Sequence, residues 1–134
     1  MFDLILPVHN SLEHVRSCLR TILKHSTLPY RLYVVNDCSD DYTSHELEAI
    51  LAGFQPDSVK LINNQKNIGY LLSCNSAISE GCAPYTVLIN SDTLVTKGYL
   101  EKVKNLLDKE PQIGVISAVS NWANWTRIPF PTIP

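Results

Sequence analysis

Leu4-Ile5-Leu6-Pro7-Val8-His9-Asn10 is a short apolar run that ends in two polar side chains. Two later stretches repeat this pattern, LYVVND at residues 32–37 and VLINSD at residues 87–92. Each run is too short for a buried helix and rich in β-branched residues, so each predicts a buried parallel strand. Ligands of an open α/β sheet bind just beyond the carboxyl ends of such strands. The side chains expected there suit a base, a phosphate and a divalent cation: His9, Asn10, Asp37 and Asp92.

Helical patterns alternate with the apolar runs. After Asn10 or Ser11, either of which can cap a helix with Glu13 in a capping box, apolar residues recur at helical spacing. The residues expected on the buried stripe of this helix are Leu12, Val15, Leu19, Ile22 and Leu23. We expect further helices at residues 44–52, 70–80 and 98–109, and further strands at 59–62, 85–89 and 113–117. The third helix offers these residues for its inner face: Leu71, Leu72, Cys74, Asn75 and Ile78.

The alternation of strands and helices predicts βαβ units and an α/β fold with a mostly parallel sheet of about five strands flanked by helices. Right-handed crossovers favour a strand order that begins 3-2-1-4. The order would then switch between strands one and four and open a crevice at their carboxyl ends. His9, Asn10 and Asp92 would border this crevice, with Asp37 one strand away.

The composition is that of an ordinary soluble globular protein, with 45% hydrophobic and 18% charged residues, and predicts one domain, residues 1–134. A formal net charge of −2 gives no broad basic field for nucleic acid or anionic lipid. Four cysteines without CxxC spacing indicate reduced thiols in a cytosolic protein. Neither a signal peptide nor a membrane span is visible. We expect a cytoplasmic location, with docking to the inner face of a membrane only through regions outside this sequence.

Two carboxylates are candidates for ligand binding, and each has a plainer alternative. Asp37 follows a strand, where a carboxylate can accept from a pyrimidine N–H; the alternative is a cap or turn residue. Asp92 in Asn90-Ser91-Asp92-Thr93 can bind Mg²⁺ or Mn²⁺ directly, with phosphate oxygens and water as the other ligands. Its alternative is a capped turn before the fourth helix. The pair Asp40-Asp41 is interpreted as solvated.

Further residues fit a nucleotide site less specifically. His9 can stack on a base or be an ordinary loop residue, and Lys66 can balance phosphate or be solvated. Asn67 and Gly69 open the third helix, where free N–H groups can face an anion, although Asn-x-Gly is also a common turn. Trp122 and Trp125 can stack on a sugar or cover the end of the sheet.

In combination, these segments resemble the inverting family-2 glycosyltransferases with a GT-A fold, which is Rossmann-like. The segments that carry the resemblance are residues 4–10, 34–41, Asn67-Ile68-Gly69 with Asn75 and Ile78, 88–95 with Gly98-Tyr99-Leu100, 113–117 and Ser120-Asn121-Trp122. The family usually has tyrosine where this chain has His9. The run at residues 88–95 resembles the NSDT variant of the family's metal motif. Order and spacing agree over nearly the whole chain.

The resemblance implies a donor site for a nucleotide-diphosphate sugar, a UDP- or dTDP-sugar, and a saccharide or lipid-linked acceptor. It implies a divalent cation, Mn²⁺ or Mg²⁺, at Asp92. The residues implied on the nucleotide side are Pro7, His9, Asn10, Asp37, Lys66, Asn67 and Gly69, and those on the sugar and diphosphate side are Asn90, Ser91 and Asp92. His9 would stack near the base, and Asp37 would bind its edge.

Two departures from the family pattern leave alternatives open. Asn90 stands where the family has the first acidic residue of its metal motif, and no residue matches the family's catalytic base, which lies further along the chain in that family. We therefore expect the donor-binding portion of a glycosyltransferase; the alternative is a non-catalytic nucleotide- or sugar-binding module. A sugar nucleotidyltransferase would need a glycine-rich basic loop after the first strand, which residues 7–12 do not offer. We also expect the tail, residues 120–134, to pack poorly or to mediate self-association; the partner would be a second copy of the chain or a missing C-terminal half.

Overall fold

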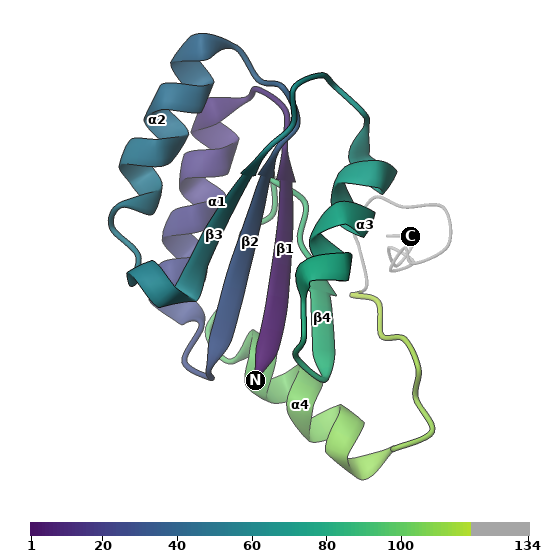
Figure 1. The fold of residues 1–134 in the computed structure, drawn as a ribbon. Coiled ribbons are helices and arrows are strands. Elements are labelled where there is room, and N and C mark those ends of the chain that lie inside the picture. Colours follow the sequence, from purple (N-terminus) through teal and green to yellow (C-terminus); the bar gives the residue numbers. More distant parts are fainter. Residues whose placement is uncertain (119–134) are drawn as a thin grey trace, which may run out of the picture. The chain divides into compact units, whose positions relative to one another are not determined.

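The computed structural model describes residues 1–118, and residues 119–134, which include Trp122 and Trp125, lie outside the described residues. The described part contains one sheet of four parallel strands in the order β3-β2-β1-β4 (Figure 1). The strands are β1 (Phe2–Val8), β2 (Tyr30–Asn36), β3 (Val59–Asn63) and β4 (Tyr85–Leu88). Phe2 pairs with Tyr30 on one side and with Tyr85 on the other, so β1 lies inside the sheet. The predicted order 3-2-1-4 is confirmed.

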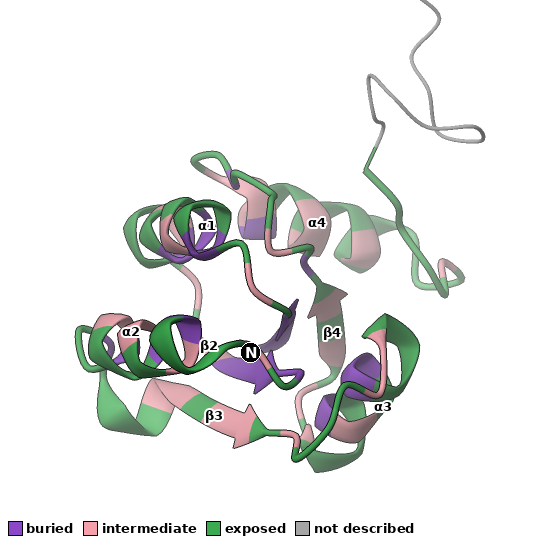
Figure 2. Ribbon diagram, turned by 90° about the horizontal axis from the view of Figure 1, so that it is seen from above, coloured by how far each residue is buried: buried purple, intermediate pink, exposed green. Residues whose placement is uncertain are grey.

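Helices cover both faces of the sheet. These helices are α1 (Leu12–His25), α2 (Asp41–Leu51) and α3 (Tyr70–Glu80), with a 3₁₀ turn η1 (Pro56–Ser58) before β3; a further described helix is α4 (Tyr99–Lys109). Viewed from above, α1 and α2 lie on one side of the sheet and α3 lies on the other (Figure 2). This is the three-layer arrangement expected of βαβ units. Within the described residues, no helix is both long enough and apolar enough to cross a membrane.

The core is centred on β1 because both of its faces are covered. All seven residues of β1 are buried, and the last five of β2 are buried too. A strand that is buried on both faces is apolar throughout rather than alternating, which is the pattern that predicted these two strands. From α1, the core receives Leu12, Val15, Cys18, Leu19 and Ile22. Leu23 was expected on this stripe but is exposed.

The predicted fifth strand at residues 113–117 is wrong, and the described sheet has four strands rather than about five. The chain divides into two compact units, residues 1–100 and 101–134, and this segment belongs to the second. A β-strand requires a neighbour for its N–H and C=O groups, and no described strand pairs with this segment. Val115 is 89% exposed, so the apolar run does not mark a buried strand here.

The inner face of α3 also differs from the prediction. Leu71 is 69% exposed, and Leu72, Asn75 and Ile78 are exposed as well. The residues that are buried are Ser73, Cys74 and Ala77. Small side chains let the helix approach β1 and β2 closely, and the Ser73 hydroxyl accepts a hydrogen bond from Asn64 Nδ2 at 3.1 Å. The orientation of α3 is therefore set by its small buried residues and by the hydrogen bond of Ser73, and its larger apolar residues are left exposed.

Helix starts follow the capping groups. α2 begins at Asp41 instead of residue 44 because Asp40 Oδ1 accepts from the Thr43 N–H at 2.7 Å. Asp40 is therefore a cap rather than a merely solvated acid. This bond lowers the pKa of the Asp40 carboxyl, because it outweighs the smaller effect of burial, which would raise that pKa. The capping box predicted for α1 is wrong, because Ser11 has φ 57° and its side chain makes no capping hydrogen bond.

The amino-terminal edge of the sheet generates a stability prediction. A methyl group at Gly81 would lie 2.6 Å from Asp3 Oδ2, and this oxygen already accepts from the N–H groups of Cys82 and Ala83. The carboxylate cannot move aside without losing those bonds. We predict that Gly81→Ala lowers the free energy of unfolding by about 1–3 kcal/mol, measured by urea denaturation. Gly114→Ala, where nothing lies within 4 Å of the added methyl, is the control; equal stability of the two variants would contradict the prediction.

Candidate functional site

The loops after β1 and β2 are joined by hydrogen bonds at the carboxyl edge of the sheet. The Asn10 N–H donates to Ser39 Oγ at 2.9 Å, and Asn10 Oδ1 accepts from the Asp40 N–H at 2.8 Å. His9 Nδ1 lies 2.9 Å from the Asp37 carbonyl oxygen, and since a carbonyl only accepts, Nδ1 carries the proton in this bond. The exposed imidazole of His9 is thus held beside the start of the second loop.

Three non-glycine residues in these two loops have left-handed backbones. The φ angles are 58° at Asn10, 57° at Ser11 and 57° at Cys38. Such conformations cost on the order of 1–3 kcal/mol each and cluster at ligand sites. Their concentration at this edge agrees with the expected place of ligand binding in an α/β sheet.

Asp37 is buried, with 4% exposure, and its carboxylate holds the loop that precedes α3. Asp37 Oδ1 accepts from Asn64 Nδ2 at 2.8 Å and from the Ile68 N–H at 2.9 Å. Asp37 Oδ2 accepts from the Gly69 N–H at 2.8 Å. Gly69 has φ 84°, a conformation that glycine adopts at no steric cost, so the sequence Asn67-x-Gly69 allows its N–H to reach the acid.

The electrostatic state of Asp37 follows from these contacts. Burial alone would raise the pKa of the carboxyl, but hydrogen bonds from Ile68, Asn64, Gly69 and Ser73 outweigh burial and lower it. Asp37 is therefore an ionised carboxylate at neutral pH. A carboxylate offers about four acceptor positions; Asn64 and Ile68 donate to Oδ1, Gly69 donates to Oδ2, and the Ser73 side chain is a fourth donor to this carboxylate.

The third loop, after β4, is fixed by α1. The Ile89 N–H donates to the Ile5 carbonyl at 2.9 Å and extends the pairing of β4 with β1 by one residue. Cys18 Sγ donates to the Asn90 carbonyl at 3.7 Å, and Thr21 Oγ1 accepts from the Val95 N–H at 3.2 Å. The Asn90 carbonyl also accepts from the Thr93 N–H at 3.0 Å. These bonds direct main-chain groups inward, and the side chains of Asn90 and Asp92 are exposed.

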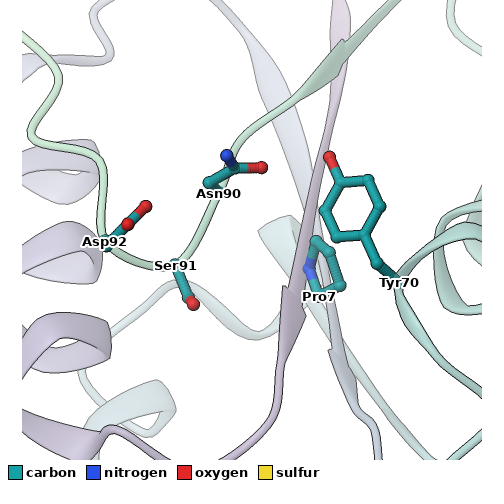
Figure 3. A pocket seen from close by; sticks show the side chains of 5 residues that line it. All are labelled: Pro7, Tyr70, Asn90, Ser91 and Asp92. Carbon is teal, nitrogen blue, oxygen red and sulfur yellow. The ribbon is translucent and has the colours of Figure 1, made fainter. Parts of the chain in front are cut away.

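A cavity of about 480 Å³ opens between this loop and the start of α3. Its lining residues are Pro7, Tyr70, Asn90, Ser91 and Asp92. Figure 3 shows Pro7 of β1 in the middle, Tyr70 on one side, and Asn90, Ser91 and Asp92 on the other. Pro7 of β1 and the loop residues Asn90–Asp92, which are more than 80 positions apart in sequence, thus line one cavity.

The structure brings most of the predicted site residues into two adjoining groups. Four of them line the cavity: Pro7, Asn90, Ser91 and Asp92. Five are linked by hydrogen bonds around the Asp37 loop: His9, Asn10, Asp37, Asn67 and Gly69. Lys66 is exposed in the same loop as Asn67 and lines neither. Tyr70 was not predicted; its place directly after Gly69, at the first position of a helix, is the signal that could have found it.

The oxygen groups at the cavity fit a divalent cation only with help from a ligand. Among the described residues, no group of three or more His, Cys, Asp or Glu side chains could hold a metal. The cavity offers the carboxylate of Asp92, the amide oxygen of Asn90 and the hydroxyl of Ser91. Mg²⁺ is commonly bound by one or two carboxylates while phosphate oxygens and water fill the other positions. Asp92 thus fits an ion that a diphosphate brings with it.

The anchoring of the α3 loop by Asp37 predicts a pH-dependent stability. A pKa that is lowered in the folded state contributes stability that is complete above the unfolded pKa and is lost as the pH falls through the folded pKa. We predict that Asp37→Asn is less stable than the wild-type chain by about 1–3 kcal/mol at pH 7. The difference should shrink below pH 3.8, the ordinary value for this carboxyl. Urea denaturation at several pH values measures it, and a difference that is independent of pH would contradict the prediction.

The thiols provide a second test of the packing behind the site. The four cysteines are free; Cys18 and Cys74 are buried, and Cys38 and Cys82 are exposed. Burial, and secondly the charge of Asp92, raises the pKa of the Cys18 thiol to about 11, and burial raises that of Cys74. Since the thiolate is the reactive form, we predict two fast and two slow thiols with Ellman's reagent at pH 8. Cys38→Ser should remove one fast thiol, and four equal rates in the native chain would disprove the packing.

Comparison with known proteins gives a family and a fold. The model of the family "Glycosyl transferase family 2" matches residues 3–128. An uncharacterized glycosyltransferase of Haemophilus influenzae is 23% identical over 113 residues, 84% of this chain and 34% of that protein. A teichoic acid poly(glycerol phosphate) polymerase of Staphylococcus epidermidis is 26% identical over 106 residues, 76% of this chain and 15% of that protein. The chain thus spans about a third or less of these two relatives.

Solved structures share the fold. S. aureus TarS 1-349 in complex with UDP-GlcNAc superposes with a TM-score of 0.71 at 21% identity, covering 88% of this chain and 37% of that one. The mannosyltransferase PcManGT from Pyrobaculum calidifontis, in complex with GDP-Man and Mn²⁺, gives 0.79 at 20% identity, covering 88% and 35%. The fold is therefore GT-A-like. Since the family model covers almost the entire sequence, the chain belongs to glycosyl transferase family 2.

Proposed function

We propose that this chain binds the donor of a glycosyltransferase that moves a sugar, with inversion, from a UDP- or dTDP-sugar to a saccharide or lipid-linked acceptor. The observation that carries the proposal is the cavity in which Pro7 of β1 meets Asn90, Ser91 and Asp92 of the β4 loop. The cavity lies at the carboxyl edge of a parallel sheet, beside the switch in strand order between β1 and β4. Family membership supplies the reaction class.

The diphosphate is assigned to the Asp92 side of the cavity. Asp92 would hold Mn²⁺ or Mg²⁺, with Asn90 and Ser91 as neutral oxygen or hydrogen-bonding groups nearby. A bound cation supplies charge neutralisation for the leaving diphosphate. A single carboxylate binds a divalent cation weakly, so Asp92 and the phosphate oxygens of the donor would bind the cation together. The solved complexes of TarS with UDP-GlcNAc and of PcManGT with GDP-Man and Mn²⁺ support this class of ligand.

The nucleoside is assigned to the neighbouring loops. Asp37 is assigned to the base edge, where the ring N–H of a pyrimidine would share the carboxylate with the donors Gly69 and Ser73. The exposed ring of His9, held by the Asp37 carbonyl, is available to stack on the base, and Asn10 fixes the loop beneath it. Lys66 is exposed and can approach the base edge or a phosphate from solvent. Asn67 and Gly69 position the turn that brings N–H groups to Asp37.

In an inverting transfer, the acceptor hydroxyl attacks the anomeric carbon directly as the diphosphate leaves. That step needs a base for the hydroxyl proton. We assign none of the described residues to this role. Asp92 is already assigned to the cation and the diphosphate, and Asp37 is buried and accepts hydrogen bonds from its neighbours. The single carboxylate of the cavity also favours, as a second candidate, a nucleotide- or sugar-binding module without catalysis.

Donor binding generates the central prediction. We expect the chain to bind UDP with Mn²⁺ in a calorimeter, and Asp92→Ala to weaken binding about tenfold with Mn²⁺ but about twofold or less with EDTA, since the carboxylate acts through the cation. Asp57→Ala, an exposed acid before β3, is the matched control and should leave binding unchanged. Asp37→Ala should weaken binding with and without metal.

Several results would overturn the proposal. The absence of heat with UDP, dTDP and GDP alike would reject a donor site. An equal loss in Asp92→Ala with Mn²⁺ and with EDTA would show that Asp92 is structural. Hydrolysis of a nucleotide sugar by the chain would reject the second candidate, the non-catalytic module, and keep the first.

A further inference from the structure

Tyr70 forms one wall of the cavity. It is the first residue of α3, its side chain is 50% exposed, and it faces the Asn90–Asp92 loop across Pro7 (Figure 3). It is the single aromatic among the residues that line this cavity. Tyr42 is more exposed, at 67%, but lies on α2 and lines neither this cavity nor a neighbouring one. The exposed ring of Tyr70 is therefore placed where a bound ligand would cover it.

The position of Tyr70 is fixed by the backbone that precedes it. The N–H groups of Ile68 and Gly69, its two preceding residues, donate to the Asp37 carboxylate. The Gly69 carbonyl accepts from the Ser73 N–H at 3.1 Å and starts the helix. Burial, and then the charge and the side-chain hydrogen bond of the neighbouring Cys74, raises the pKa of the Tyr70 phenol, so the phenol is neutral at physiological pH. A preorganised ring loses little conformational freedom when it binds a ligand.

The occupant of this side of the cavity follows from the connectivity of the donor. The diphosphate of a nucleotide sugar is bonded to the nucleoside at one end and to the sugar at the other. The nucleoside end belongs to the loops of His9 and Asp37, and neither residue lines the cavity; of the residues expected on the nucleotide side, Pro7 of β1 does line it. The part of the donor that extends from Asp92 into the cavity is therefore the sugar. An aromatic face with a hydroxyl at its tip suits a sugar ring, which has apolar C–H faces and polar edges.

We propose that Tyr70 is a specificity-determining residue that contacts the transferred sugar of the donor, with its ring against a C–H face of the sugar. The inference rests on the proposed function, since it needs a nucleotide-sugar donor. It deepens that function by assigning recognition of the sugar to α3, on the opposite side of β1 from the loop that carries Asp92.

The test compares each nucleotide sugar with its own nucleoside diphosphate. The wild-type chain, Tyr70→Ala, Tyr70→Leu, Tyr70→Phe and the control Tyr42→Ala are titrated with UDP-GlcNAc and UDP, and with GDP-mannose and GDP, all with Mn²⁺. We expect Tyr70→Ala to weaken sugar-nucleotide binding by about tenfold and nucleoside-diphosphate binding by about twofold or less. Tyr70→Phe should keep the preference for the sugar nucleotide within about threefold, and Tyr42→Ala should behave as the wild type.

Each outcome decides between the two levels of the proposal. If the wild-type chain binds none of the four ligands and does not bind dTDP either, the proposed function fails and the assignment of Tyr70 falls with it. If the wild type binds but Tyr70→Ala and Tyr70→Leu lower both members of a pair equally, or neither, only the assignment of Tyr70 is overturned. A variant that is only less stable loses affinity for the nucleotide sugar and for its nucleoside diphosphate by the same factor. The ratio of the two dissociation constants therefore separates sugar recognition from stability. Tyr70→Leu supplies the ratio if the alanine variant does not fold.

Discussion

The hydrogen bonds of Asp37 are the constraint on which the rest of the site depends. The carboxylate collects the Asn64 amide and the N–H groups of Ile68 and Gly69, and the carbonyl of the same residue receives His9 Nδ1. One residue at the end of β2 thus ties the loop after β1 to the loop before α3. A buried anion is costly in an apolar surrounding, and here oriented N–H dipoles provide the compensation instead of a cation. Loss of these bonds would free the turn that positions Tyr70.

The two carboxylates of the proposed site are separated by burial, and burial determines what each can do. Asp37 is nearly inaccessible and its carboxylate already accepts hydrogen bonds from several neighbours, so its main role is to organise the backbone. Asp92 is exposed on a loop that Cys18 and Thr21 hold from below, so its carboxylate is open to solvent, a cation or a phosphate-bound ion. With one open carboxylate, the proposed metal site would need the donor to complete it, which would couple metal binding to donor binding.

The sequence predicted what depends on strand pattern and failed where close packing or a partner strand decides. The apolar runs predicted β1, β2 and β4, and the rule of right-handed crossovers predicted their order. In this order β1 and β4 are neighbours, so Pro7 and Asp92 line the same cavity. The run at residues 113–117 has the same composition but no described partner strand, and composition does not encode a partner. In α3, Ser73 and Ala77 face the sheet while Leu71 faces solvent, because an approach distance and the Asn64 bond outweigh hydrophobicity. Tyr70 was missed for the same reason: the orientation of α3 aims it at the cavity.

Every donor contact argued above lies between Pro7 and Asp92, inside the compact unit formed by residues 1–100. If the proposed function is correct, donor binding is a property of this unit, whichever residue supplies the base for transfer. The chain spans 34% of the Haemophilus influenzae relative and 37% of the TarS chain, so the whole proteins contain much that this cavity does not need. Binding and chemistry are thus separable here. In the proposed function, the cavity would orient a donor between Asp92 and Tyr70 with the sugar presented to the open side, and an acceptor would approach from that side for a direct displacement.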